Sequence, residues 1–86
     1  MNKVKIRKLK QEDVKSLDRL YYHFWNEQSN IQLMNEKFSK LSNNDSYIFL
    51  VVEVDNVIAG SILGIVCHEL YGNCRPFLLM EDLIVD

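Results

Sequence analysis

The chain has 86 residues, enough for one small domain, and its 48% hydrophobic and 26% charged residues are typical of a folded globular protein. Its net charge of −2 is too small to indicate nucleic acid or a membrane surface as the partner. Two cysteines are too few for a disulfide framework, and the sequence shows neither a signal peptide nor an apolar run long enough to span a membrane, so we expect a cytoplasmic protein.

Charge is distributed unevenly along the chain. The first 40 residues hold nine Lys or Arg against five Asp or Glu, whereas the rest of the chain holds one against seven. The basic run at residues 3–10 could be a nucleic-acid-binding arm. Because Val4, Ile6 and Leu9 interrupt it, we interpret it instead as the solvated side of an edge strand.

The N-terminal half predicts one strand and two helices. Residues 4–9 read as a short strand, and the apolar residues of 11–28 then recur at helical spacing, which predicts a first helix. A polar break follows, and residues 33–41 predict a second, weaker helix.

The pattern changes after the polar loop at residues 42–46. Residues 47–54 and 57–67 are rich in β-branched and apolar side chains and predict two strands, joined by a tight turn at Asp55 and Asn56. Residues 77–85 predict a final strand. Consecutive strands with short connections indicate an antiparallel meander.

The predicted order is β-α-α-β-β-β, an α+β fold that we expect to form a single domain over residues 1–86. Three of the strands are apolar on both faces, so the sheet should be covered on both sides. The helical material is sufficient for only one face, and we therefore expect the other face to be open. Gly60 and Gly64, inside a predicted strand, indicate a bulge or a close approach of two backbones.

Two adjacent carboxylates, Glu81 and Asp82, interrupt the apolar last strand. Side chains alternate along a strand, so we expect the two to lie on opposite faces and not to form a glycosidase pair. A carboxylate held in a partly buried, dry site can act as a general base near neutral pH. The alternatives are a salt bridge to Arg7 or Arg75, or simple exposure at a strand end.

Other chemically active residues give weaker signals. Cys67, His68 and Cys74 match no common zinc spacing, and no phosphate-binding glycine motif is present, so we predict no metal site. An aromatic cluster on the first helix could be core packing or a ligand cage: Tyr21, Tyr22, Phe24 and Trp25.

Taken together, these segments resemble the N-terminal half of the GNAT (GCN5-related) N-acetyltransferases. The opening VKIRKLKQEDVKSL resembles the family's first strand and helix, and YIFLVVEVDNVIAGSILGIV resembles its second and third strands. FLLMEDLIVD resembles its fourth strand, in the form seen in members that acetylate polyamines and other small amines. The resemblance covers essentially the whole chain and implies a partial GNAT-like fold.

The resemblance implies acetyl-CoA as cosubstrate, lying along the last strand. Backbone groups of Leu83, Ile84 and Val85 would pair with its pantetheine arm, and one of their N–H groups would polarise the thioester carbonyl.

The resemblance also implies roles for side chains. The acceptor amine must lose a proton before it attacks, and Glu81 is the favoured base, with Asp82 as the second candidate. Three aromatic side chains would line the acceptor side: Tyr22, Phe24 and Trp25.

Family members continue with an Arg/Gln-x-x-Gly-x-Gly/Ala loop whose helix binds the CoA pyrophosphate. The 86 residues hold no such loop, so the resemblance implies a truncated chain, inactive or incomplete alone. The main alternative is a non-catalytic interaction module that forms a homodimer through the last strand and the uncovered sheet face. A third possibility is an unrelated α+β binding domain.

Overall fold

The structure, a computed structural model, describes residues 3–85. The elements follow the predicted order, with a short 3₁₀ turn η1 before the first helix: β1 (Val4–Lys8), η1 (Gln11–Asp13), α1 (Val14–Trp25), α2 (Ile31–Leu41), β2 (Tyr47–Val54), β3 (Val57–Cys67) and β4 (Phe77–Val85). The predicted α+β class is confirmed.

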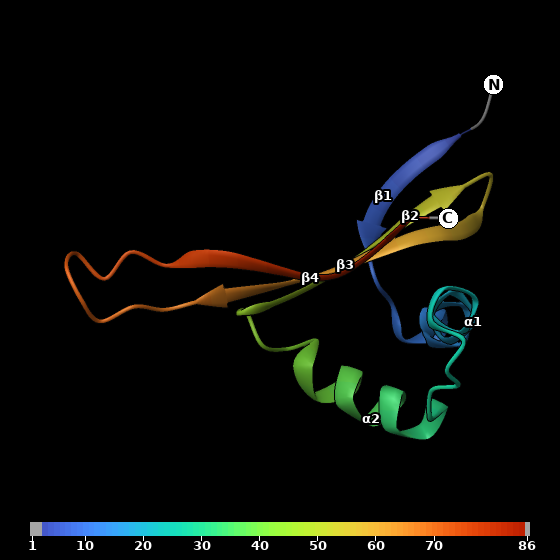
Figure 1. Ribbon diagram of the computed structural model, residues 1–86, viewed down its shortest axis with the longest axis horizontal. Helices are drawn as coiled ribbons and strands as arrows, with labels where there is room; N and C mark the ends of the chain where they lie inside the picture. Colours follow the sequence, from blue (N-terminus) through green and yellow to red (C-terminus); the bar gives the residue numbers. More distant parts are fainter. Residues whose placement is uncertain (1–2, 86) are drawn as a thin grey trace.

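The four strands form one antiparallel sheet in the order β1-β2-β3-β4. The predicted meander is therefore confirmed, and β1 lies at one edge of the sheet, as its lysine-rich pattern predicts. Figure 1 shows both helices on the same side of the sheet, while the β3–β4 hairpin reaches well beyond them.

Side chains fix where the helices begin. The Asp13 carboxylate accepts a hydrogen bond from the Lys10 backbone N–H at 2.7 Å, at the turn that leads into α1. Helix α2 begins two residues earlier than predicted, because the Asn30 side chain accepts a hydrogen bond from the Leu33 N–H at 3.1 Å and caps the helix. Helix α1 ends at Trp25, and the next residue, Asn26, caps it with a left-handed backbone (φ 53°).

The β2–β3 connection is the tight turn that the sequence predicts. Asp55 and Asn56 both have positive φ, 52° and 69°, as a two-residue type I′ hairpin turn requires. The predicted close backbone approach is also present, at Gly60. A Cβ atom there would lie 2.8 Å from the Ile84 carbonyl oxygen, so only glycine lets β3 and β4 come this close.

The core lies between the helices and one face of the sheet. Its buried residues come from the β1–α1 connection, from α1 and from the strands: Leu9, Leu17, Leu20, Val51 and Ile84. Helix α2 adds Met34 and Phe38, and the Phe38 ring meets Phe49 edge to face.

The other face of the sheet carries no helix within residues 3–85. The strand register places apolar side chains of all four strands there, and we define the open face by ten of them: Val4, Ile6, Ile48, Leu50, Val52, Ile62, Val66, Leu78, Met80 and Val85. Among them Ile6 is 67% exposed and Met80 61%. The prediction that the helices cover only one face is confirmed. None of the described helices is long and apolar enough to span a membrane.

Candidate functional site

A β-bulge interrupts the last strand at its two carboxylates. Glu81 pairs with Leu63 of β3, and Ile84 pairs with Ser61. Residues 82–83 of β4 therefore stand opposite a single residue of β3. A bulge of this kind bends the strand and redirects its side chains.

The backbone of Asp82 produces the bulge. Its φ of 53° lies in the left-handed region, which few residues other than glycine enter, although aspartate tolerates it. The expectation that Glu81 and Asp82 simply alternate across the sheet assumes an unbroken strand, and the bulge breaks that alternation. The register places Glu81 level with Leu63 and Phe49, on the side of the sheet that the helices cover.

Neither carboxylate of β4 lies in a partly buried, dry site within residues 3–85. Glu81 and Asp82 are both exposed, because β4 is an edge strand that water reaches. A salt bridge to Arg7 is also ruled out, since the guanidinium of Arg7 is paired with Asp13 and Glu53. No ion pair joins either carboxylate to Arg75 among residues 3–85, so of the two alternatives the structure shows simple exposure.

Two hydroxyl groups lie beside the bulge on the helix side. Ser61, paired with Ile84, is buried, and its Oγ has no hydrogen-bond partner of good geometry among residues 3–85. Burial raises the pKa of the Tyr21 phenol, and the negative charge of Asp82 raises it further, whereas the nearby Ser61 hydroxyl lowers it. Tyr21 of α1 is therefore close to both residues. A buried hydroxyl without a partner is uncommon and can bind a water or a ligand.

The sequence pattern does not single out either hydroxyl as part of a site. A serine inside an apolar strand is a weak signal, and its burial depends on the packing of α1. Tyr21 belongs to the predicted aromatic cluster, but only the fold shows that it lies near the bulge.

The three aromatic residues predicted to line one pocket do not come together. Trp25 contacts the Tyr21 ring with centroids 5.0 Å apart, which places it on the side of α1 near the bulge. Phe24 instead contacts His23 edge to face at 5.6 Å. Tyr22 lines a separate pocket with other polar residues: Asp18, Arg19 and Gln28.

The end of β4 offers a free backbone edge. The Ile84 side chain is buried in the core, whereas Leu83 and Val85 are 68% and 70% exposed. No described strand pairs with the outer edge of β4, so the backbone groups there are available to an extended ligand.

The described residues fit the acyl-pantetheine end of acetyl-CoA, which needs an extended backbone partner. They do not fit its pyrophosphate, because no glycine-rich loop opens a helix among them. No three His, Cys, Asp or Glu side chains in residues 3–85 gather closely enough to hold a metal ion.

Comparison with protein-family models and with curated protein sequences gives no match. Solved structures do match. Glucosamine-6-phosphate N-acetyltransferase from Arabidopsis thaliana has a TM-score of 0.83 at 24% identity, over 98% of this chain and 60% of that one. A GNAT family acetyltransferase from Staphylococcus aureus has a TM-score of 0.77 at 18% identity, over 95% and 62%. Aminoglycoside N-acetyltransferase AAC(6')-Iy, solved in complex with CoA, has a TM-score of 0.76 at 15% identity, over 99% and 57%.

The chain therefore has the fold of the GNAT acetyltransferases, as its sequence resemblance predicts. It spans about 60% of the length of these structures. At such low identities the shared property is the fold.

Proposed function

We propose that the chain takes part in acetyl transfer from acetyl-CoA to a small primary amine, such as a polyamine, with the reaction centred on the β4 bulge. One observation carries the proposal: a bulged edge strand with free backbone groups, in a fold shared with acetyltransferases. A structural neighbour solved in complex with CoA supports this choice of cosubstrate.

The proposed chemistry uses the backbone and side chains of β4. The acyl-pantetheine arm pairs with residues 83–85, and a backbone N–H there donates to the thioester oxygen as negative charge develops on it. The amine nitrogen forms a bond to the thioester carbon, the C–S bond breaks, and the leaving CoA thiolate takes up the second proton of that nitrogen to become the thiol. The amine is mostly protonated at neutral pH, so Glu81, or Asp82 as second candidate, accepts its proton through water.

The acceptor side is proposed to be formed by α1. Trp25 is the favoured one of the predicted aromatic residues, because it packs on Tyr21, which lies close to Asp82 and Ser61. Phe24 and Tyr22 would contribute only to the outer part of the acceptor site.

The 86 residues alone are expected to bind intact acetyl-CoA weakly, because they hold no pyrophosphate-binding loop. Isothermal titration calorimetry of the chain with acetyl-CoA measures this. Binding with a micromolar Kd would contradict the expectation.

A direct test of the proposed site uses S-acetylpantetheine, which lacks the pyrophosphate. We expect titration followed by heteronuclear NMR to shift the backbone amides of residues 82–85, with millimolar or weaker affinity. Pantetheine without the acetyl group is the control for contacts of the arm alone. If no β4 amide moves, or if only amides elsewhere move, the proposed site is wrong.

A second candidate function is favoured by the open face. We propose that two copies of the chain pack these faces together. A two-fold axis parallel to the strands would set β1 of one copy over β4 of the other. The exposed apolar side chains of the open face, among them Ile6 and Met80, favour a second copy as the occupant, because the same surface on each copy would cover the other.

A further inference from the structure

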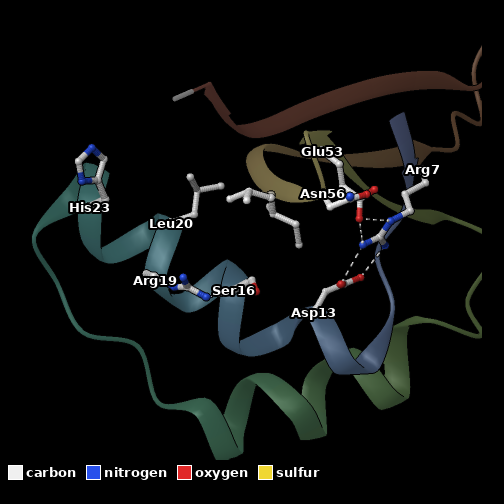
Figure 2. A pocket seen from close by; sticks show the side chains of 10 residues that line it. Arg7, Asp13, Ser16, Arg19, Leu20, His23, Glu53 and Asn56 are labelled. Atoms are coloured by element: carbon white, nitrogen blue, oxygen red, sulfur yellow. Dashed lines mark hydrogen bonds and ion pairs between the residues drawn. The ribbon is translucent and has the colours of Figure 1, made fainter. Parts of the chain in front are cut away.

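A second pocket lies between α1 and the β2–β3 hairpin, and no residue of β4 lines it. Its volume is about 420 Å³, large enough for a small molecule. Its polar lining comes from Ser16, Arg19 and His23 of α1, from Asn56 of the turn, and from an ion network that includes Glu53 (Figure 2). We call it the hairpin pocket.

The ion network uses every hydrogen-bond donor of the Arg7 guanidinium. Its Nε and Nη2 donate to Glu53 Oε1 at 3.1 and 2.9 Å, and Nη1 and Nη2 donate to the two Asp13 oxygens at 2.7 and 2.9 Å. Nη1 also donates to the Lys8 carbonyl at 3.0 Å. All five guanidinium N–H donors are thus in use, so Arg7 has none left for a ligand.

The network leaves a negative group at one end of the pocket. The network contains two carboxylates and one guanidinium, so its net charge is −1. Both hydrogen bonds to Glu53 go to Oε1, and its Oε2 has no hydrogen-bond partner among residues 3–85. Glu53 can therefore accept a hydrogen bond from a ligand cation.

The other end of the pocket is positive. Arg19 follows Ser16 by three residues and precedes His23 by four, a spacing that puts all three on one side of α1. The guanidinium of Arg19 makes one long contact, 3.4 Å from Nη2 to Ser16 Oγ, so most of its donors remain available. In Figure 2 the Arg7 network lies at one side of the pocket, while Arg19 and His23 lie toward the other.

We propose that the hairpin pocket binds a small zwitterion, with its amine toward Glu53 and its carboxylate or phosphate toward Arg19. A lone anion would meet the negative network, and a lone cation would leave Arg19 unmatched. A ligand with both charges makes a charge-assisted hydrogen bond at each end. This inference does not depend on acetyl transfer at β4.

The test titrates the chain with two zwitterions, O-phosphoethanolamine and β-alanine, and with two single-charge probes, ethanolamine and inorganic phosphate. Heteronuclear NMR follows the amides of Ser16, Arg19 and Asn56. We expect at least one zwitterion to shift these amides and to bind about tenfold more tightly than either single-charge probe. Whether phosphoethanolamine or β-alanine binds more tightly identifies the anionic group, and either result supports the site.

Matched arginine variants locate the contact. Arg19→Gln is expected to weaken zwitterion binding about tenfold, because it removes one charge-assisted hydrogen bond. Arg75→Gln, in the exposed β3–β4 loop, should leave the affinity unchanged. An unchanged spectrum outside the pocket verifies that Arg19→Gln is folded. The proposal is overturned if no probe moves these amides, if phosphate alone binds as tightly as the zwitterions, or if Arg19→Gln binds like the unaltered chain.

Discussion

At the scale of single residues, Arg7 has the most extensive set of interactions described in this structure. Its guanidinium joins the end of β1 to the start of the helical region through Asp13 and to β2 through Glu53. The side chains of Arg7 and Asp13 are only 17% and 10% exposed, so their charges are partly removed from water. Such a pair has a large effect when it is broken, since the remaining charge is left without a partner.

Arg7→Ala is expected to lower the free energy of unfolding by about 2–3 kcal/mol, because it leaves two carboxylates unpaired. Urea denaturation measures the change. Arg75→Ala, in an exposed loop, is the matched control and should change stability by less than about 0.5 kcal/mol. Equal effects of the two substitutions would show that the network does not stabilise the fold.

The lowered pKa of Asp13 predicts how the free energy of unfolding depends on pH. Hydrogen bonds from Arg7 hold the pKa of the Asp13 carboxyl below its ordinary value, although burial acts in the opposite direction. A carboxylate with a lower pKa in the folded state stabilises the fold above its unfolded pKa of about 4, and this stabilisation is lost as the pH falls through the folded pKa.

We therefore expect the free energy of unfolding to decrease below about pH 4, and to decrease less in Arg7→Ala over the same range. Urea denaturation at several pH values compares the two proteins, and the difference between them removes the contribution of the other carboxylates. Parallel curves would contradict this assignment.

At the scale of elements, β4 combines two features that are unfavourable in an isolated sheet. It is an apolar edge strand, which exposes free backbone groups, and it contains a bulge that interrupts its ladder with β3. The bulge redirects the strand at the carboxylates and beside the Tyr21 and Ser61 hydroxyls. The left-handed backbone of Asp82 therefore sets the direction of β4 at the candidate site.

Asp82→Val is expected to destabilise the protein by about 1–2 kcal/mol, because a β-branched residue is strained at positive φ. Asp82→Gly, which removes the same carboxylate, should be neutral or slightly stabilising, since glycine adopts this backbone without strain. Urea denaturation compares the two variants. If valine and glycine were equally stable, the left-handed bulge would not form in solution.

At the scale of the whole molecule, the protein has two layers where its strands are patterned for three. The open face exposes a contiguous apolar surface of the kind that usually marks an interaction site. About 40% of the length of each of the longer structures that share this fold is not matched by this chain. Self-association through the open face can be tested on the 86 residues themselves.

Size-exclusion chromatography with light scattering at tens of micromolar is expected to give twice the 10.1 kDa chain mass. Met80→Lys, on the open face, should shift the protein to the monomer, because a buried, unpaired charge opposes association. Leu70→Lys is the control, since Leu70 is 93% exposed in the loop beyond the helices. A monodisperse monomer for the unaltered chain would rule out the open-face dimer.

The sequence by itself determined the elements, because periodicity and turn residues act locally. The strands at residues 47–54, 57–67 and 77–85 lie where their patterns predict them, and the Asp55–Asn56 turn follows from the conformations that these residues tolerate. The open face was also predictable, since it needs only the polarity of the strands and the amount of helix.

Only the tertiary structure decided which residues meet. The left-handed backbone of Asp82 interrupts the alternation of side chains between the two faces of the sheet. The periodicity of the sequence does not predict this interruption. The burial of Ser61 beside Tyr21, and the charges of the hairpin pocket, depend on how α1 packs against strands far away in the chain. Elements follow from local preferences, whereas sites arise from long-range contacts that a linear pattern does not contain.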